Sequence, residues 1–74
     1  MKEEDKELQK VNAILNTRIR LAKQTAERLE KRAEELEARG FTRASAVSSA
    51  EAAAAKVKAR RIVATQTKIN QNMQ

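Results

Sequence analysis

Apolar residues recur along the first half of the chain at alternating spacings of three and four. The two interleaved series are Leu8, Leu15, Ala22, Leu29 and Leu36, and Asn12, Ile19, Ala26 and Ala33. This spacing is typical of a coiled-coil seam, because it keeps one side of an α-helix facing a partner helix. The pattern therefore predicts a long helix over about residues 2–39.

The second half of the chain carries a weaker version of the same pattern. Its seam runs from small or polar residues to larger ones, in the order Ser45, Ser48, Ala52, Ala55, Ala59, Ile62, Gln66, Ile69 and Met73. Neither half contains proline or an internal glycine, and both are rich in residues of high helix propensity. We therefore expect a second helix over about residues 43–70.

Gly40 is the only glycine of the chain and separates the two predicted helices. Glycine often ends a helix in the left-handed conformation, with a contact between the residue after it and the third-last helical residue. Here those residues are Phe41 and Leu36. Thr42 is a suitable N-cap for the second helix, because its hydroxyl can accept a hydrogen bond from a following amide. The turn is expected at residues 40–42, with Phe41 as a structural corner or, alternatively, an exposed binding residue.

A turn at Gly40 makes the helices antiparallel, and pairing residues whose numbers add up to 81 aligns the two seams. Large residues then face small ones near the turn, as in Leu36 with Ser45, and alanines face each other in the middle. Small residues let helices approach more closely than the usual separation of roughly 8–10 Å. The predicted fold is all-α: one antiparallel two-helix coiled-coil hairpin over residues 1–74, about 55 Å long at roughly 1.5 Å per residue.

Several large apolar residues lie off this seam. They form a stripe on the first helix and further exposed positions on the second, and they are Val11, Ile14, Leu21, Val47, Val57 and Val63. A lone hairpin would leave them in water, and exposed apolar stripes usually mark a further interface. We therefore expect these residues to be a protein interface, covered by oligomerisation, for example into a four-helix bundle, or by a helix of another protein.

The charges of the chain are unevenly placed. The sequence has 16 basic and 10 acidic residues, but all the charged residues within 8–26 and 52–74 are basic. The hairpin brings these two stretches side by side in its open half, by which we mean the half away from the turn. The basic residues there that could contact phosphates are Arg18, Arg20, Lys23, Lys56, Lys58, Arg60 and Arg61.

This basic half has two interpretations. It could bind RNA or DNA phosphates, with an affinity that falls as salt rises. Alternatively, it keeps the protein soluble and matches an acidic protein partner. Binders of single strands usually supply aromatic stacking platforms, whereas this chain has one phenylalanine and no other aromatic residue. We therefore predict an association module, such as an assembly subunit, an adaptor or a chaperone-like protein, with nucleic-acid binding as the alternative.

The sequence offers little for catalysis. It has no cysteine and no histidine, which excludes disulfides, thiolate metal sites and the usual general bases. Seam serines such as Ser45 are expected to fill space where the helices come close. Four glutamates near one helical face are expected to be solvated instead of binding a metal, and they are Glu27, Glu30, Glu34 and Glu37. We predict that the chain is not an enzyme and uses no cofactor and no small-molecule substrate.

Two further expectations concern location and register. No apolar run reaches the roughly 18 residues of a membrane span, and the acidic, polar start of the chain lacks a signal-peptide pattern. A cytoplasmic location is therefore the default expectation.

Asn12 and Gln66 place amides at the seam of the open half. Such amides either fix register and partner number at a cost in stability, or they mark frayed chain ends.

Overall fold

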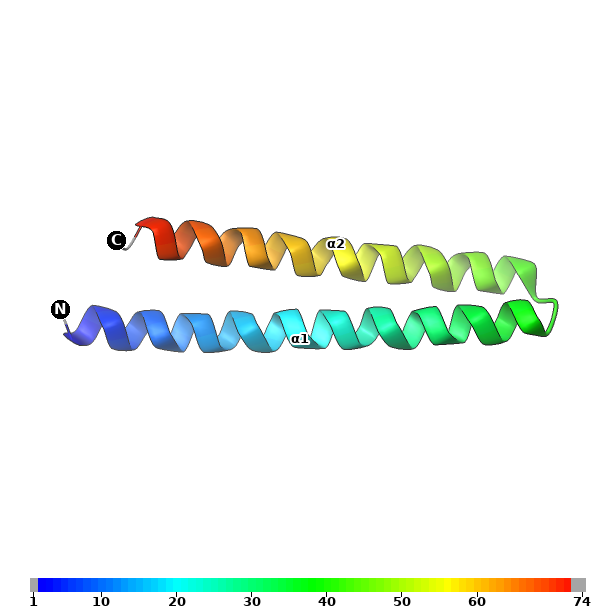
Figure 1. Cartoon of the computed structure of the whole chain (residues 1–74), viewed down its shortest axis with the longest axis horizontal. Coiled ribbons are helices and arrows are strands. Elements are labelled where there is room, and N and C mark those ends of the chain that lie inside the picture. The colour runs from blue at the N-terminus through cyan, green and yellow to red at the C-terminus, as the bar shows by residue number, and fades with distance from the viewer. Residues whose placement is uncertain (1, 73–74) are drawn as a thin grey trace.

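The structure is a computed structural model that describes residues 2–72 of the chain. It consists of two α-helices, α1 over Lys2–Ala38 and α2 over Thr42–Asn72. The helices run antiparallel and side by side, joined by a short turn at one end (Figure 1). The predicted all-α helical hairpin is therefore confirmed. Its longest dimension is 58 Å, close to the length expected from the helix rise.

Helix α1 ends in the motif that Gly40 predicts. The φ angle of Gly40 is 83°, in the left-handed region. The amide of Phe41 donates to the carbonyl of Leu36 at 2.9 Å, and the amide of Gly40 donates to the carbonyl of Glu37 at 2.9 Å. These are the two hydrogen bonds of a Schellman ending. The role predicted for Gly40 is thus confirmed, and Phe41 lies exposed at the corner of the hairpin.

The prediction that Thr42 caps α2 is wrong by one residue. The amide of Ser45 donates to the carbonyl of Phe41 at 2.9 Å, and Thr42 already belongs to the helix. The N-cap is the residue whose carbonyl accepts the first helical hydrogen bond, which makes it Phe41. The chain has already reversed direction at Gly40 and Phe41. Thr42 is therefore the first residue of α2 and does not occupy the N-cap position.

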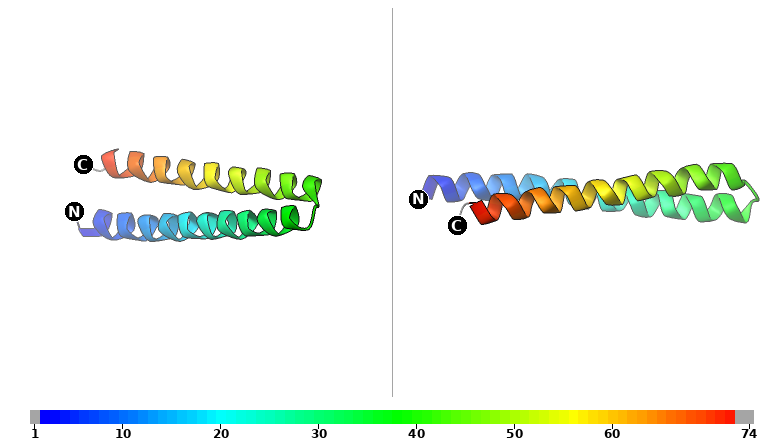
Figure 2. Two further views of the ribbon diagram at one scale, coloured as in Figure 1. Left: turned by 45° about the vertical axis from the view of Figure 1, so that its right-hand side comes forward. Right: turned by 90° about the horizontal axis from the view of Figure 1, so that it is seen from above.

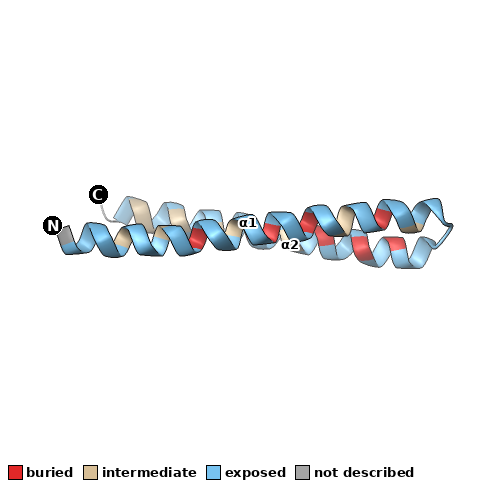
Figure 3. Cartoon of the chain, turned by 90° about the horizontal axis from the view of Figure 1, so that it is seen from below, coloured by how far each residue is buried: buried red, intermediate tan, exposed pale blue. Residues whose placement is uncertain are grey.

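Burial follows the predicted seam on both helices (Figure 3). The least exposed residues are Ala26 and Ala52, each at 2%. Among the residues whose burial the structure describes, those that are buried all lie at seam positions, and they are Leu15, Ala22, Ala26, Ala33, Ser45, Ser48, Ala52 and Ala59. The remaining seam residues from Leu8 to Ile69 are half-buried. The expected pairing of Leu8 with Met73 lies outside the described residues.

Hydrogen bonds between the helices agree closely with the predicted register. Ser45 bonds to Ala33 and Gln66 bonds to Asn12, two pairs whose residue numbers add up to 78. Gln66 also bonds to Asn16, and Asn12 bonds to Asn70, two pairs whose numbers add up to 82. The predicted sum of 81 lies between these values, so the seams meet as expected.

The helices lie closer together near the turn than at their open ends (Figure 1), and they cross at a shallow angle (Figure 2). The seam residues explain this change in spacing. From the Ala22 and Ala59 layer to the turn, most seam residues are alanine or serine. Beyond that layer the seam holds larger residues, including Ile19, Ile62 and Gln66. Larger side chains keep helices further apart, because their volume has to fit between the two axes.

Candidate interaction surfaces

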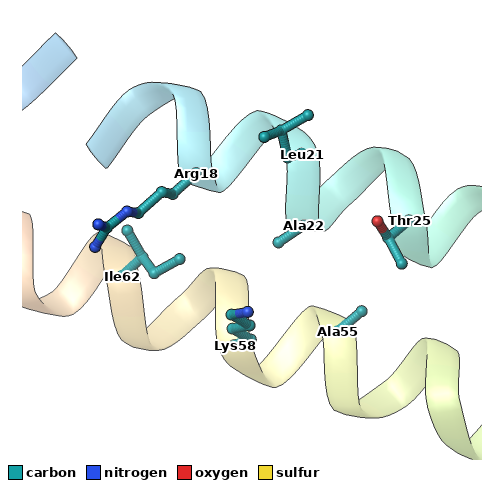
Figure 4. A pocket seen from close by; sticks show the side chains of 7 residues that line it. All are labelled: Arg18, Leu21, Ala22, Thr25, Ala55, Lys58 and Ile62. Carbon is teal, nitrogen blue, oxygen red and sulfur yellow. The ribbon is translucent and has the colours of Figure 1, made fainter. Parts of the chain in front are cut away.

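A groove crosses the middle of the hairpin between α1 and α2 (Figure 4), and we call it the central groove. It is lined by Arg18, Leu21, Ala22, Thr25, Ala55, Lys58 and Ile62. Its lining is mainly apolar, while Arg18 of α1 and Lys58 of α2 supply two positive charges. In Figure 4 the Arg18 side chain extends from α1 toward Ile62 of α2. The central groove therefore suits an apolar side chain that has an acidic neighbour.

A second groove lies at the open end of the hairpin, and we call it the terminal groove. It is lined by Glu3, Glu4, Glu7, Leu8, Val11 and Ile69. Its apolar residues are surrounded by three carboxylates, so its charge is opposite to that of the central groove. Glu7 also forms an ion pair with Lys10 at 3.3 Å, and both side chains are largely exposed. Such an exposed pair adds little stability.

The central and terminal grooves lie on the same side of α1. Glu7, Val11, Ile14, Arg18 and Leu21 follow one another at spacings of four and three residues, which places them in a row along one side of a helix. Val11 and Glu7 line the terminal groove, whereas Arg18 and Leu21 line the central groove. The row thus connects the two grooves, and we call the surface that carries them the groove face.

A third groove, the basic groove, lies on the opposite side of the seam. It is lined by Lys23, Lys56, Ala59, Arg60 and Val63. Lys23 and Leu21 flank the buried Ala22 in the sequence, and successive residues of a helix are about 100° apart around its axis. The two side chains therefore leave the seam in opposite directions. As a result, the basic groove and the groove face are separate surfaces.

The six apolar residues predicted to form a protein interface are all exposed, by between 38% and 58%. The structure nevertheless distributes them over more than one surface. Val11, Ile14 and Leu21 share the groove face, whereas Val63 lines the basic groove. Val47 and Val57 lie on α2 and line none of the three grooves. Of the predicted interface, Val11, Ile14 and Leu21 are therefore the residues that share one surface, with Arg18 between Ile14 and Leu21.

The predicted phosphate-binding residues are likewise divided. Arg18 and Lys58 line the central groove, and Lys23, Lys56 and Arg60 line the basic groove. The other two, Arg20 and Arg61, line neither of these grooves. In addition, the Lys56 ammonium forms an ion pair with the Glu30 carboxylate across the two helices, with both side chains about half exposed. Five of the seven predicted residues are therefore divided between two grooves on opposite sides of the hairpin.

A cluster of four amides joins the helices in the open half. The Gln66 Nε2 atom donates to Asn16 Oδ1 at 2.9 Å and to Asn12 Oδ1 at 3.3 Å. The Asn12 Nδ2 atom donates to Asn70 Oδ1 at 3.1 Å. Asn12 and Gln66 are the two amides expected at the seam, whereas the seam pattern does not include Asn16 and Asn70. The signal was present, because each missed residue lies four positions after an identified one, on the same side of its helix.

The described residues hold no other arrangement with evident chemistry. Among residues 3–72, no three histidine, cysteine, aspartate or glutamate side chains are grouped so that they could hold a metal ion. Within the same range, each buried polar side-chain atom has a hydrogen-bond partner. Neither of the two described helices is long and apolar enough to cross a membrane. The candidate functional sites are therefore the groove face and the basic groove.

Comparison with known proteins adds no relative. No protein-family model, curated protein or solved structure matches the chain.

Proposed function

We propose that the chain is a non-enzymatic protein–protein association module, such as a small assembly subunit, an adaptor or a chaperone-like protein. The observation that carries this proposal is the row of large apolar side chains on the groove face, of which Leu21 is 53% exposed. The row lies beside two grooves that are lined by further apolar residues. A partner helix laid along it would remove these side chains from water, at roughly 25 cal/mol for each Å² of apolar surface buried.

The small core of the hairpin supports the same proposal. Its buried residues are mainly alanine and serine, and larger seam residues such as Ile19 and Ile62 are only half-buried. Alanine buries little apolar area, and small domains with thin cores usually need a further source of stability such as oligomerisation. Association through the groove face would supply it. Stability and function would then depend on the same contact.

The experiment that tests this proposal measures mass and helicity together. Sedimentation equilibrium of the wild type should give a mass above the 8.3 kDa of one chain, with helicity rising as concentration rises. Leu21→Glu should lower both at the same concentration, because it places a carboxylate in the apolar lining of the central groove, at the end of the row. Ala13→Glu is the matched control, because it introduces the same charge at an exposed position. Ala13 lies on the side of α1 that faces away from the row. Its mass and helicity should equal those of the wild type.

Two results would overturn the proposal. One is a wild-type chain that is fully helical and monomeric at every concentration, because it would show that the hairpin needs no partner. The other is a Leu21→Glu variant that associates as strongly as the wild type. Circular dichroism is needed alongside the mass, because it separates a loss of association from a loss of helix.

Phosphate binding is the second candidate function, favoured by the convergence of Lys23, Lys56 and Arg60 around the basic groove. We propose RNA or DNA backbones as the ligands in this case. Binding to a labelled duplex should weaken steeply between low and moderate salt, as counterion release requires. Arg60→Glu should abolish binding, whereas Arg43→Glu, the same change near the turn, should have a smaller effect. No binding at low salt, or equal losses for the two variants, would rule this function out.

A further inference from the structure

The two grooves of the groove face carry complementary charges. The terminal groove surrounds Leu8, Val11 and Ile69 with carboxylates, whereas the central groove places Arg18 and Lys58 beside Leu21, Ala22 and Ile62. Val11 and Ile14 lie between the acidic and the basic end of the row. One face of the hairpin therefore presents an acidic apolar groove and a basic apolar groove in line.

The order of residues along this row is self-complementary. Glu7 lies four residues before Val11, and Arg18 lies four residues after Ile14. A two-fold axis between Val11 and Ile14 pairs residues whose numbers add up to 25. It therefore places Glu7 opposite Arg18 of a second copy, and Val11 opposite Ile14 of that copy. Interfaces with such a two-fold axis use the same surface on both subunits, so they require self-complementarity of this kind.

We propose that the groove face binds the groove face of a second copy, with the two α1 helices antiparallel and the two-fold axis between Val11 and Ile14. This inference rests on the proposed association function and names its partner. In the dimer, the terminal groove of each copy lies against the central groove of the other. The acidic and basic groups meet twice, on either side of an apolar centre formed by Val11 and Ile14.

Glu7 and Arg18 cannot reach each other within one hairpin, and Glu7 instead forms an exposed ion pair with Lys10 of the same helix. Glu7 and Arg18 are 11 positions apart, which is about 16 Å along α1 at roughly 1.5 Å per residue. That separation exceeds the Debye length of about 8 Å at physiological ionic strength, so their attraction within one chain is largely screened. A second copy brings the same groups into contact. The complementarity of this face is thus directed at another molecule.

The chain itself provides the acids that the central groove needs. Residues 8–26 contain no acidic residue, whereas Glu3, Glu4 and Glu7 are gathered around the terminal groove. In the proposed dimer, Leu21 lies opposite Glu4 of the second copy, next to the apolar lining of the terminal groove. The overlap covers residues 3–22 of α1 in both copies and leaves the turn halves outside. This agrees with the exposed Glu27, Lys31 and Glu35 of the turn half, whose alternating charges suit water.

A charge-exchange experiment tests both the partner and the register. Glu7→Arg alone and Arg18→Glu alone each place like charges across both contacts, and each should raise the dissociation constant by about tenfold or more. An equal mixture of the two variants should associate as strongly as the wild type, because each contact in the mixed dimer again joins an acid and a base. Sedimentation equilibrium of the two variants, separate and mixed, measures this. Recovery cannot come from changes in helix stability, since both substitutions are present in the mixture.

The control replaces the arginine partner by one outside the overlap. Glu7→Arg combined with Arg43→Glu in one chain also leaves the net charge unchanged, but it keeps like charges across both contacts, so its association should stay as weak as that of Glu7→Arg alone. Absence of recovery in the mixture of Glu7→Arg with Arg18→Glu would overturn the proposed dimer, while loss of association in Leu21→Glu would still uphold the association function. A poorly helical, monomeric wild type would overturn self-association and assign the groove face to another protein. A fully helical monomer would overturn both proposals.

Discussion

The hydroxyl of Ser45 donates a hydrogen bond of 3.0 Å to the backbone carbonyl of Ala33, across the contact between α2 and α1. Both residues are buried. A serine at this position keeps the helices close, because it is small, and it satisfies its own hydroxyl without help from water. The turn end of the hairpin is therefore both tightly packed and fully hydrogen-bonded.

Substitutions of Ser45 should separate these two contributions. Ser45→Ala removes the hydrogen bond and should lower the free energy of unfolding by about 1 kcal/mol. Ser45→Val also adds volume between the helices, and overpacking should bring the loss to about 1–3 kcal/mol. Urea denaturation at one fixed protein concentration measures both values, and Ser49→Ala, at an exposed position, is the control. A Ser45→Val variant more stable than the wild type would contradict the close approach.

The middle of the seam should be intolerant of larger side chains. Ala52 is 2% exposed, so Ala52→Leu has to push α2 away from α1 or adopt a strained rotamer. A loss of about 1–3 kcal/mol in the free energy of unfolding is expected. Ala53→Leu is the matched control, because Ala53 is exposed on the next position and leucine has high helix propensity. Equal stability of the two variants in thermal denaturation would show that the seam is not closely packed there.

Gly40 should be sensitive to substitution for a conformational reason. Its φ angle of 83° is unfavourable for residues that carry a Cβ atom, and no other atom lies within 4 Å of the place where a Cβ would be. Gly40→Ala should therefore cost about 1–2 kcal/mol through backbone strain alone. Gly40→Asn should cost less, because asparagine tolerates the left-handed region better. Chemical denaturation of the two variants checks this order, and an unchanged Gly40→Ala variant would contradict it.

The amide cluster should limit stability and fix the assembly. Replacing Asn12 and Gln66 together by leucine converts a polar layer into an apolar one, and the midpoint of thermal unfolding should rise. Polar residues at seam positions specify register and partner number at a cost in stability. Sedimentation velocity should accordingly show additional oligomeric species for this variant. Gln24→Leu, at an exposed position, is the control. A lower midpoint with one unchanged species would refute this role for the cluster.

The fold was predictable because it depends on local features of the sequence. The alternation of three and four residues defines the seam of α1, and Gly40 defines the turn. Even the weak seam of α2 proved sufficient, since Ala52 and Ala59 are buried against α1 as the pairing required. Alanine is only weakly hydrophobic, so a row of alanines is a weak indication of a buried helix face. Its small side chain nevertheless suits the narrow space between two closely packed helices. The register followed from matching large residues with small ones.

The surfaces were less predictable, because they depend on how side chains are placed around both helices at once. Arg18 and Lys23 belong to one basic stretch of the sequence, yet they line different grooves on opposite sides of the buried Ala22. The acidic first turn of α1, where carboxylates suit the positive end of the helix dipole, also surrounds an apolar groove that includes Ile69 of α2. Neither relationship exists until the two helices are paired.

The described ends of the hairpin, Lys2 and Asn72, lie at the same end of the molecule (Figure 1). A force that pulls these ends apart therefore acts on one seam layer at a time, beginning in the open half and moving toward Gly40. The layers cannot share the load, so a single hairpin would open one layer after another and would not resist with all layers together. A second copy bound across residues 3–22 would cover the first layers to open. The association surface would thus also resist mechanical opening of the hairpin at the end where such a force first acts.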